Sequence, residues 1–389
     1  NISDDYKSKI KLISHLELTS AVYAKYDVII GSGRVCIESI LTGVPTIAFG
    51  EARFIGLVTE KNFQEALKTN FGDIDLKSKT PKIDERKLIE DVEMACNNNQ
   101  FLPLSLPLQS LSELCETHFS LESISQKVLR IYESAYFLKN QPNWIPILMY
   151  HKIPDAELKS QHKIYVTKNN FEKHLQFFKK QGFQTLTFTD LEQYRQGQKD
   201  FRHFPKKPLI LTFDDGYKDN LENASPLLKK YNFRAQLFLL ADPQINQNFW
   251  DKNETEPAHE IIAGSERLQW RNSAFEIGSH GFSHQKITSL NDTEALNELV
   301  NSKKYLEKEF GTNVNVYAFT YGSSSKKAAE LAEKAGYGYA VNTDSGGLNI
   351  EEAPYSIFRV NIFPNETNWS LLKKTSTWYR RYYFFKRKK

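Results

Sequence analysis

Short apolar segments alternate with amphipathic stretches in the first part of the chain. The segment KYDVIIGSG (25–33) has the character of a strand that ends in glycines, RVCIESILTG (34–43) has helical spacing, and VPTIAF (44–49) has the character of a second strand. A strand, a glycine turn, a helix and a further strand in this order are typical of a βαβ unit with parallel strands. The first part is therefore predicted to be a Rossmann-like α/β region.

From Ile147 onward the same alternation continues with a longer period. Segments with strand character cover residues 147–150, 183–188, 208–213, 234–240, 275–279, 316–321, 338–342 and 357–363. Amphipathic helical stretches lie between most of them, notably at 169–181, 291–310 and 325–336. This succession of βα-like units predicts a (β/α) barrel, regular or distorted. In such barrels the chemistry gathers at the C-terminal ends of the strands.

A break in the helical pattern separates the two parts. The segment KNQPNWIP (139–146) follows an amphipathic stretch at 119–139 and contains two prolines. Proline cannot continue a helix, so this segment is predicted to be a domain boundary. The expected organisation is an α/β region over residues 1–140, a barrel over residues 141–377 and a short tail over residues 378–389.

Length and composition bound the class of protein. The chain has 389 residues, of which 40% are hydrophobic and 25% charged, values typical of a globular protein with two or three domains. No apolar run reaches the roughly 18 residues that a membrane-spanning helix needs. Three cysteines without a CxxC pair indicate neither a disulfide framework nor a zinc knuckle, and they favour a reducing compartment. The expected location is the cytoplasm or the cytoplasmic face of a membrane.

The positive charge is concentrated at the end of the chain. The net charge is +4, and the last residues, WYRRYYFFKRKK, are basic and aromatic without a single acid. Such a segment suits an anionic membrane surface or a polyanion, and it is equally consistent with a solvated tail. Basic residues elsewhere are balanced by acids, so nucleic acid is not expected as a partner.

Two adjacent carboxylates follow a strongly apolar strand. Asp214 and Asp215 come directly after residues 208–213, and two such acids repel each other unless a cation lies nearby. The segment EIGSHGFSHQ supplies His280 and His284, four residues apart and also after a predicted strand. Asp215 and the two histidines make a set of three metal ligands that leaves a position open for water. Asp214 would then be free to act as the general base.

The motifs TFDDG (212–216) and SHGFSH (279–284) together resemble those of the polysaccharide deacetylase family, carbohydrate esterase family 4, also called the NodB-homology domain. The resemblance covers roughly residues 145–375. It implies a distorted (β/α) barrel that hydrolyses N- or O-acetyl groups on sugars with a divalent metal, commonly zinc, with cobalt or nickel as alternatives. It also implies Asp214 as the base and a metal held by three ligands, namely Asp215, His280 and His284.

The segment VYAFTYG (316–322) departs from the motif that this family carries here. The resemblance implies that the backbone N–H of Tyr321 helps to hold the oxyanion, but Thr320 replaces the usual proline and the family's arginine is absent. Arg359, in the neighbouring predicted strand, either orients the base in its place or forms a structural ion pair.

The family's late histidine, which supplies a general acid, is also missing, since no histidine follows His284. His151 at the end of the first barrel strand is expected to take this role, with a packing role as the alternative, because closing a barrel brings its first and last strands together. Histidines outside any motif are expected at the surface or in loops: His162, His174, His203 and His259.

Residues 1–75, through the segment 26–51, resemble the C-terminal, nucleotide-sugar-binding half of two-domain (GT-B type) glycosyltransferases. The resemblance implies a partial domain in which a glycine loop at a helix start faces a diphosphate and an acid binds the donor. The matching residues are Gly31, Ser32, Gly33, Arg34 and Glu38. Amide groups at a helix start are natural phosphate ligands, but a short glycine loop is also found in purely structural βα units.

These observations predict metal-dependent hydrolysis of acetyl groups, N-acetyl in the first place, on a cell-envelope polysaccharide or glycan precursor. Two alternatives remain open. The barrel is a degenerate carbohydrate-binding module, or the chain is a glycosyltransferase that uses a nucleotide sugar and carries the barrel as an accessory. The sugar, the acyl group, the metal and the oligomeric state do not follow from the sequence.

Overall fold

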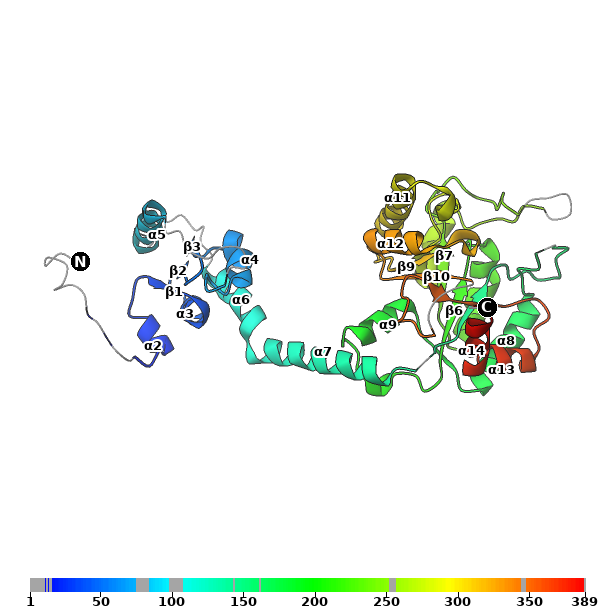
Figure 1. Ribbon diagram of the computed structural model, residues 1–389, viewed down its shortest axis with the longest axis horizontal. Helices are drawn as coiled ribbons and strands as arrows, with labels where there is room; N and C mark the ends of the chain where they lie inside the picture. Colours follow the sequence, from blue (N-terminus) through cyan, green and yellow to red (C-terminus); the bar gives the residue numbers. More distant parts are fainter. Residues whose placement is uncertain are drawn as a thin grey trace. The chain divides into compact units, whose positions relative to one another are not determined.

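The computed structural model describes residues 11, 13, 16–74, 84–97, 108–142, 144–160, 162–251, 257–343 and 348–387. The chain divides into two compact units, an N-terminal unit (Asn1–Leu129) and a C-terminal unit (Arg130–Lys389) (Figure 1). The division falls inside helix α7 (Leu121–Asn140). The boundary predicted after residue 140 lies at the end of that helix. The last turns of α7 belong to the C-terminal unit because Phe137 is buried there against Tyr194 and Phe204.

The N-terminal unit contains a small sheet in the order β1-β2-β3. Its strands are β1 (Ile29–Gly31), β2 (Thr46–Phe49) and β3 (Phe54–Leu57). Its helices are α2 (Ser20–Tyr23), α3 (Gly33–Leu41), α4 (Glu60–Lys68), α5 (Glu85–Asn97), α6 (Leu108–Phe119) and the start of α7. Strands β1 and β2 are parallel and α3 connects them, which agrees with the predicted βαβ unit. Strand β3 pairs antiparallel to β2, which the hydrophobic pattern does not predict.

The C-terminal unit is built around a parallel sheet. Its strands are β4 (Ile147–Tyr150), β5 (Gln184–Thr185), β6 (Pro208–Phe213), β7 (Ala235–Leu239), β8 (Phe275–Ser279), β9 (Val316–Ala318), β10 (Tyr339–Asn342), β11 (Ile357–Phe358) and β12 (Val360–Asn361). The order is β11-β10-β9-β8-β7-β6-β4-β12, and β5 pairs with β6 beside this path. Every pair in the path is parallel.

The two end strands of this sheet are almost consecutive in the sequence. Strands β11 and β12 are the end members of the order, yet only Arg359 separates them in the sequence. The sheet therefore curls round until one stretch of chain pairs with β10 on one side and with β4 on the other. The result is a nearly closed barrel, as predicted, with an irregular closure at Arg359.

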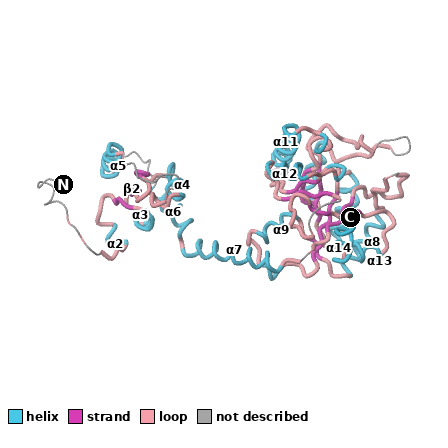
Figure 2. Tube along the Cα trace, viewed as in Figure 1, coloured by secondary structure: helices cyan, strands magenta, loops and turns pink. Residues whose placement is uncertain are grey.

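Helices surround the barrel, whose strands lie at the centre of the C-terminal unit (Figure 2). They are α8 (Lys168–Lys180), α9 (Phe188–Arg195), α10 (Ser225–Lys230), α11 (Asp292–Phe310), α12 (Lys326–Lys334), α13 (Asn368–Lys374) and α14 (Thr377–Arg387). Shorter helical turns are η1 (Phe201–His203), η2 (Asn220–Ala224), η3 (Gly264–Asn272), η4 (Ile287–Ser289) and η5 (Thr320–Gly322). Helix α11 begins at a capping box formed by Asn291 and Glu294, and Gly311 in the left-handed conformation ends it.

Alternation along β6 explains which side chains reach the barrel interior. Leu209 and Leu211 pack in the cluster that contains the surrounding helices, whereas Ile210 packs in the cluster that contains the opposite strands β9 and β10. Side chains two residues apart share a face of the sheet, so Thr212 and Asp214 lie on the same face as Ile210. The strand thus directs Asp214 toward the barrel axis.

Two predicted strands extend beyond the observed ones for local reasons. In residues 183–188 the strand stops after Thr185, because Thr187 forms a capping box with Asp190 and starts α9. In residues 316–321 the strand ends at Ala318, and Tyr321 adopts a left-handed conformation that no strand contains.

Within the described part of the chain, no helix combines the length and the apolar character that crossing a bilayer requires.

Candidate active site

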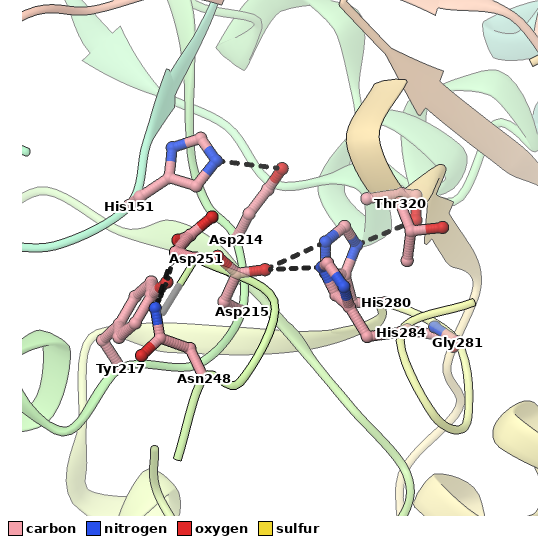
Figure 3. A network of polar contacts seen from close by, with 12 residues as sticks. His151, Asp214, Asp215, Tyr217, Asn248, Asp251, His280, Gly281, His284 and Thr320 are labelled. Atoms are coloured by element: carbon pink, nitrogen blue, oxygen red, sulfur yellow. Dashed lines mark hydrogen bonds and ion pairs between the residues drawn. The ribbon is translucent and has the colours of Figure 1, made fainter. Parts of the chain in front are cut away.

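Side chains from the ends of four barrel strands line one pocket. His151 follows β4, Asp214 and Asp215 follow β6, His280 follows β8 and Tyr321 follows β9. The pocket has a volume of about 470 Å³. Because parallel strands end at the same rim of a barrel, residues far apart in the sequence converge here. Figure 3 shows the histidines and carboxylates pointing toward one another across this rim.

Asp215, His280 and His284 come together as a buried cluster. The Nε2 atoms of His280 and His284 lie 3.2 Å and 3.3 Å from the same Asp215 oxygen, Oδ1. One ligand atom from each residue lies within 4.8 Å of the other two, so a single metal ion could contact all three. The structure therefore brings together the three ligands that the sequence proposed.

The lone pairs that face one another in this cluster repel unless a cation lies between them. His280 donates its Nδ1–H to the carbonyl oxygen of Ala318 (2.9 Å), which leaves an unprotonated Nε2 in the neutral ring. That lone pair faces a carboxylate oxygen, a repulsive contact unless a proton or a metal ion lies between them. Burial opposes a charged imidazole, but the hydrogen bond and negative charge of Asp215 raise the pKa of His280 above its ordinary value. The residues present therefore fit a divalent metal.

Unusual backbone geometry supports the cluster. Asp215 and His284 have φ angles of 70° and 61°, in the left-handed region that side-chain-bearing residues seldom adopt. Gly216 follows with φ of 72°, and a Cβ on it would lie 2.3 Å from a side-chain carbon of Leu239. The turn after β6 thus needs glycine at position 216. Strained residues of this kind gather at functional sites, where the surrounding structure holds them.

Asp214 is held by Arg359. Two hydrogen bonds of 2.6 Å and 2.7 Å join the guanidinium to the two carboxylate oxygens, and Arg359 also donates to Thr212 Oγ1 at 3.2 Å. Both side chains are buried. Burial alone would raise the pKa of Asp214, but the charge of Arg359 and its hydrogen bonds hold that pKa below its usual value. Arg359 is thus paired with Asp214, an arrangement that agrees both with orientation of the base and with a structural ion pair.

His151 lies on the other side of Asp214. Its Nε2 is 4.0 Å from Asp214 Oδ2, and its side chain faces the pocket (Figure 3). Burial lowers the pKa of His151 below its ordinary value despite the nearby carboxylates. Asn220 donates from Nδ2 to the carbonyl oxygen of His151 (2.7 Å) and so fixes the backbone at this strand end. The imidazole is therefore within reach of a group bound next to Asp214.

Tyr321 also lines the pocket. Its φ is 57°, its ring is half exposed, and its ring centre lies 4.7 Å from that of His284. Thr320, which stands where the family carries proline, donates its hydroxyl to the carbonyl oxygen of Gln285 (2.6 Å). This hydrogen bond ties the turn of Tyr321 to the loop that carries His284.

The sequence interpretation missed Trp250 and Asp251. The Trp250 ring stacks on His284 with centres 3.7 Å apart and planes 14° apart. Asp251 accepts hydrogen bonds from Tyr217 (3.3 Å) and Asn248 (3.1 Å) and lines the pocket. These residues lie in a long connection between β7 and β8 without regular hydrophobic periodicity. The only signal in the sequence was an aromatic side chain next to an acid within an irregular segment.

Of the histidines predicted at the surface or in loops, His162 agrees with the prediction and His174 does not. His162 is exposed, but it lines the active-site pocket. His174 is buried in helix α8 with Nδ1 3.2 Å from the Tyr150 hydroxyl, and burial lowers its pKa to about 4. The prediction for His174 was wrong because the apolar face of α8 carries it into the core.

The glycine loop of the N-terminal unit is stabilised by internal contacts. Gly31 ends β1, and Ser32 precedes the first residue of α3. The amide of Gly33 donates to the carbonyl oxygen of Asn70 (3.1 Å). Glu38 forms an ion pair with Arg34 and accepts the Tyr23 hydroxyl (2.9 Å). The Gly33 amide and the Glu38 carboxylate, which would have to bind a nucleotide sugar, already have partners within the unit. Sugar binding at this loop stays a prediction.

Known proteins resemble the C-terminal unit. The sequence profile of the family described as polysaccharide deacetylase matches residues 202–340. YxkH of Bacillus subtilis (strain 168), named for the same family, is 28% identical over 232 residues, which cover 59% of this chain and 76% of that protein. A poly-beta-1,6-N-acetyl-D-glucosamine N-deacetylase of Staphylococcus aureus (strain NCTC 8325 / PS 47) is 24% identical over 250 residues, which cover 59% of this chain and 82% of the relative. The Streptococcus pyogenes deacetylase PplD, solved in complex with acetate, is 23% identical with a TM-score of 0.49 over 60% of this chain and 98% of that chain.

The matched region contains both carboxylates of the β6 turn and both histidines of the cluster. The C-terminal unit therefore carries a polysaccharide deacetylase domain of the NodB-homology type. The similarity of this domain to polysaccharide deacetylases identifies the C-terminal unit as a hydrolase.

Proposed function

We propose that the C-terminal unit hydrolyses N-acetyl groups on a cell-envelope polysaccharide with the help of a divalent metal. The observation that carries this proposal is the convergence of Asp215, His280 and His284 next to the buried Asp214–Arg359 pair. The name of the Staphylococcus aureus relative supports a polymer of N-acetylglucosamine as the substrate class. Side chains suited to hold a metal and to act as a base line one pocket, and this arrangement supports the proposal.

The metal would be held by Asp215 and the Nε2 atoms of His280 and His284. Two imidazoles and one carboxylate suit zinc, and cobalt or nickel can replace it in such a set. When bound, such an ion supplies Lewis-acid chemistry: it lowers the pKa of water towards neutrality and polarises a carbonyl group. His280 keeps its orientation through the hydrogen bond to Ala318.

The remaining residues move protons and hold the substrate. Asp214 accepts a proton from water as the water oxygen attacks the acetyl carbonyl carbon. Arg359 keeps Asp214 ionised and aimed at the pocket. The backbone N–H of Tyr321 stabilises the negative oxygen that develops. His151 in its protonated form gives a proton to the amine nitrogen as the C–N bond breaks, which releases acetate and a free amine. The imidazole is then neutral, the state that its burial favours.

Acetate release from N-acetylglucosamine oligomers tests the proposal. The full chain is treated with a chelator, dialysed, and assayed with and without added zinc, cobalt or nickel. We expect no acetate from the chelated protein and restored release with at least one of these metals. A folded protein that releases no acetate with any of the three would contradict the proposal and favour a degenerate carbohydrate-binding module.

Removing the charge of Arg359 should alter the pH dependence of the reaction. In Arg359→Gln the cation that lowers the pKa of Asp214 is lost while the burial that raises it remains, so this pKa rises. The base must be ionised to act, and the acid limb of kcat/KM against pH therefore moves to higher pH. Breaking a buried pair also costs about 3–5 kcal/mol of stability.

Arg359→Lys is the matched variant, because it keeps the positive charge but not the paired hydrogen bonds. We expect its acid limb to lie between those of the wild type and of Arg359→Gln. An unchanged acid limb in folded Arg359→Gln would show that Arg359 is only a structural partner.

A further inference from the structure

The C-terminal helix α14 is docked on the barrel through one of its faces. Tyr379 and Arg380 are buried, and the Arg380 guanidinium lies 4.5 Å from the ring centre of Phe358 in β11. Arg380 also lies over the ring of Phe384, one turn further along the helix. Residues 378–387 of the segment predicted as a tail therefore form a helix that packs on the C-terminal unit, and the opposite face of this helix points to solvent.

The outward face of α14 is aromatic. Trp378, Tyr382 and Phe385 are 60%, 45% and 59% exposed, and they follow one another at spacings of four and three residues. This spacing places them on one side of the helix. The Trp378 and Tyr382 rings stack with centres 5.4 Å apart. Large aromatic side chains exposed together on one surface are typical of a binding site.

Basic side chains accompany these rings. Arg381 and Lys386 are exposed on the same part of α14, and Lys386 lies 5.8 Å from the Tyr382 ring centre. From Thr367 to the last residue the sequence contains no acid and eight basic residues: Lys373, Lys374, Arg380, Arg381, Lys386, Arg387, Lys388 and Lys389. Because the whole chain has a net charge of only +4, the remainder is negative overall and the positive charge is local.

We propose that the outward face of α14, defined by Trp378, Arg381, Tyr382, Phe385 and Lys386, binds the surface of an anionic phospholipid bilayer. A polyanion in solution would satisfy the basic groups but would leave the three rings in water. The lipid interface accepts both, since aromatic rings insert at the headgroup level and basic groups attract anionic lipids. The proposal does not rest on the proposed deacetylase function.

Sedimentation of the full chain with vesicles tests this proposal. Vesicles with about one third phosphatidylglycerol in phosphatidylcholine are compared with vesicles of phosphatidylcholine alone. We expect binding to the anionic vesicles, weaker binding at high salt, and little binding to the neutral ones. The variant Trp378→Ser/Tyr382→Ser/Phe385→Ser and the variant Arg381→Glu/Lys386→Glu should each bind at least about tenfold more weakly.

The control variant Ile89→Ser/Met94→Ser/Leu268→Ser removes three comparably exposed apolar side chains elsewhere, and it should bind like the wild type. An unchanged thermal unfolding midpoint shows that a variant folds. If the aromatic variant does not fold, the charge variant provides the test. Absence of binding to anionic vesicles would overturn the proposal. Binding of the aromatic variant to anionic vesicles as tightly as the wild type would also overturn it. The same holds if heparin displaces the wild type and the aromatic variant from the vesicles equally, or if the protein forms a dimer in solution that the aromatic variant disrupts.

Discussion

Asp214→Asn is expected to keep its metal and to lower acetate release by about 10²–10⁴-fold, the usual contribution of a general base. Asparagine has nearly the shape of aspartate and retains a carbonyl oxygen that can accept a hydrogen bond from Arg359. It cannot accept a proton from water. The metal ligands are untouched, so metal content per protein should equal that of the wild type while kcat falls.

Asp200→Asn is the matched control, because Asp200 caps the turn η1 on the surface and pairs with Arg202. Its acetate release should be that of the wild type. Wild-type turnover in Asp214→Asn would mean that another group accepts the proton. Loss of metal together with activity would mean that Asp214 belongs to the ligand set rather than acting as a free base.

His280→Ala is expected to lose both the metal and measurable turnover. The imidazole provides one of three protein ligands, and alanine leaves Asp215 and His284 without the third. Two protein ligands hold a catalytic metal poorly, since catalytic zinc sites commonly have three. Metal content by atomic emission and acetate release on the same sample check this expectation.

His203→Ala is the control for this variant, since His203 lies exposed in η1 outside the pocket. It should keep both metal and activity. Retained metal and turnover in folded His280→Ala would contradict the assignment of the ligands. Addition of imidazole to the variant gives a further check, because it restores a ligand of the same chemistry without restoring the side chain.

The barrel could be predicted because its strands are buried on both faces. A parallel strand covered by helices is apolar throughout, and residues 208–213 and 275–279 coincide with β6 and β8. The closure could not be predicted in detail. The stretch 357–363 has the character of one strand, but Arg359 turns inward to Asp214 and splits it into β11 and β12.

The convergence of Asp215, His280 and His284 could be predicted because these residues lie in two short motifs. Asp215 follows one strand, and His280 and His284 follow another, so the rule that parallel strands share a rim brings them together. Arg359 was harder, because its partner Asp214 lies 145 positions away in the sequence. Arg359 was considered only because the segment 316–322 lacks the arginine that the resemblance led us to expect there.

The loop residues that line the pocket could not be predicted from the sequence. Trp250 and Asp251 reach the site through an irregular connection, where side-chain direction depends on tertiary packing rather than on a repeating pattern. His162 likewise reaches the pocket from a loop, and its isolation in the sequence gave no hint of this. Loop residues such as these shape the pocket around groups that the strands fix in place.

Anomalous diffraction at the zinc edge, from crystals of the full chain grown with zinc, tests the metal assignment most directly. The account predicts one strong peak about 2.0–2.2 Å from an oxygen of Asp215 and from the Nε2 atoms of His280 and His284. A well-ordered site without such a peak, or a peak that lies on other side chains, would contradict it.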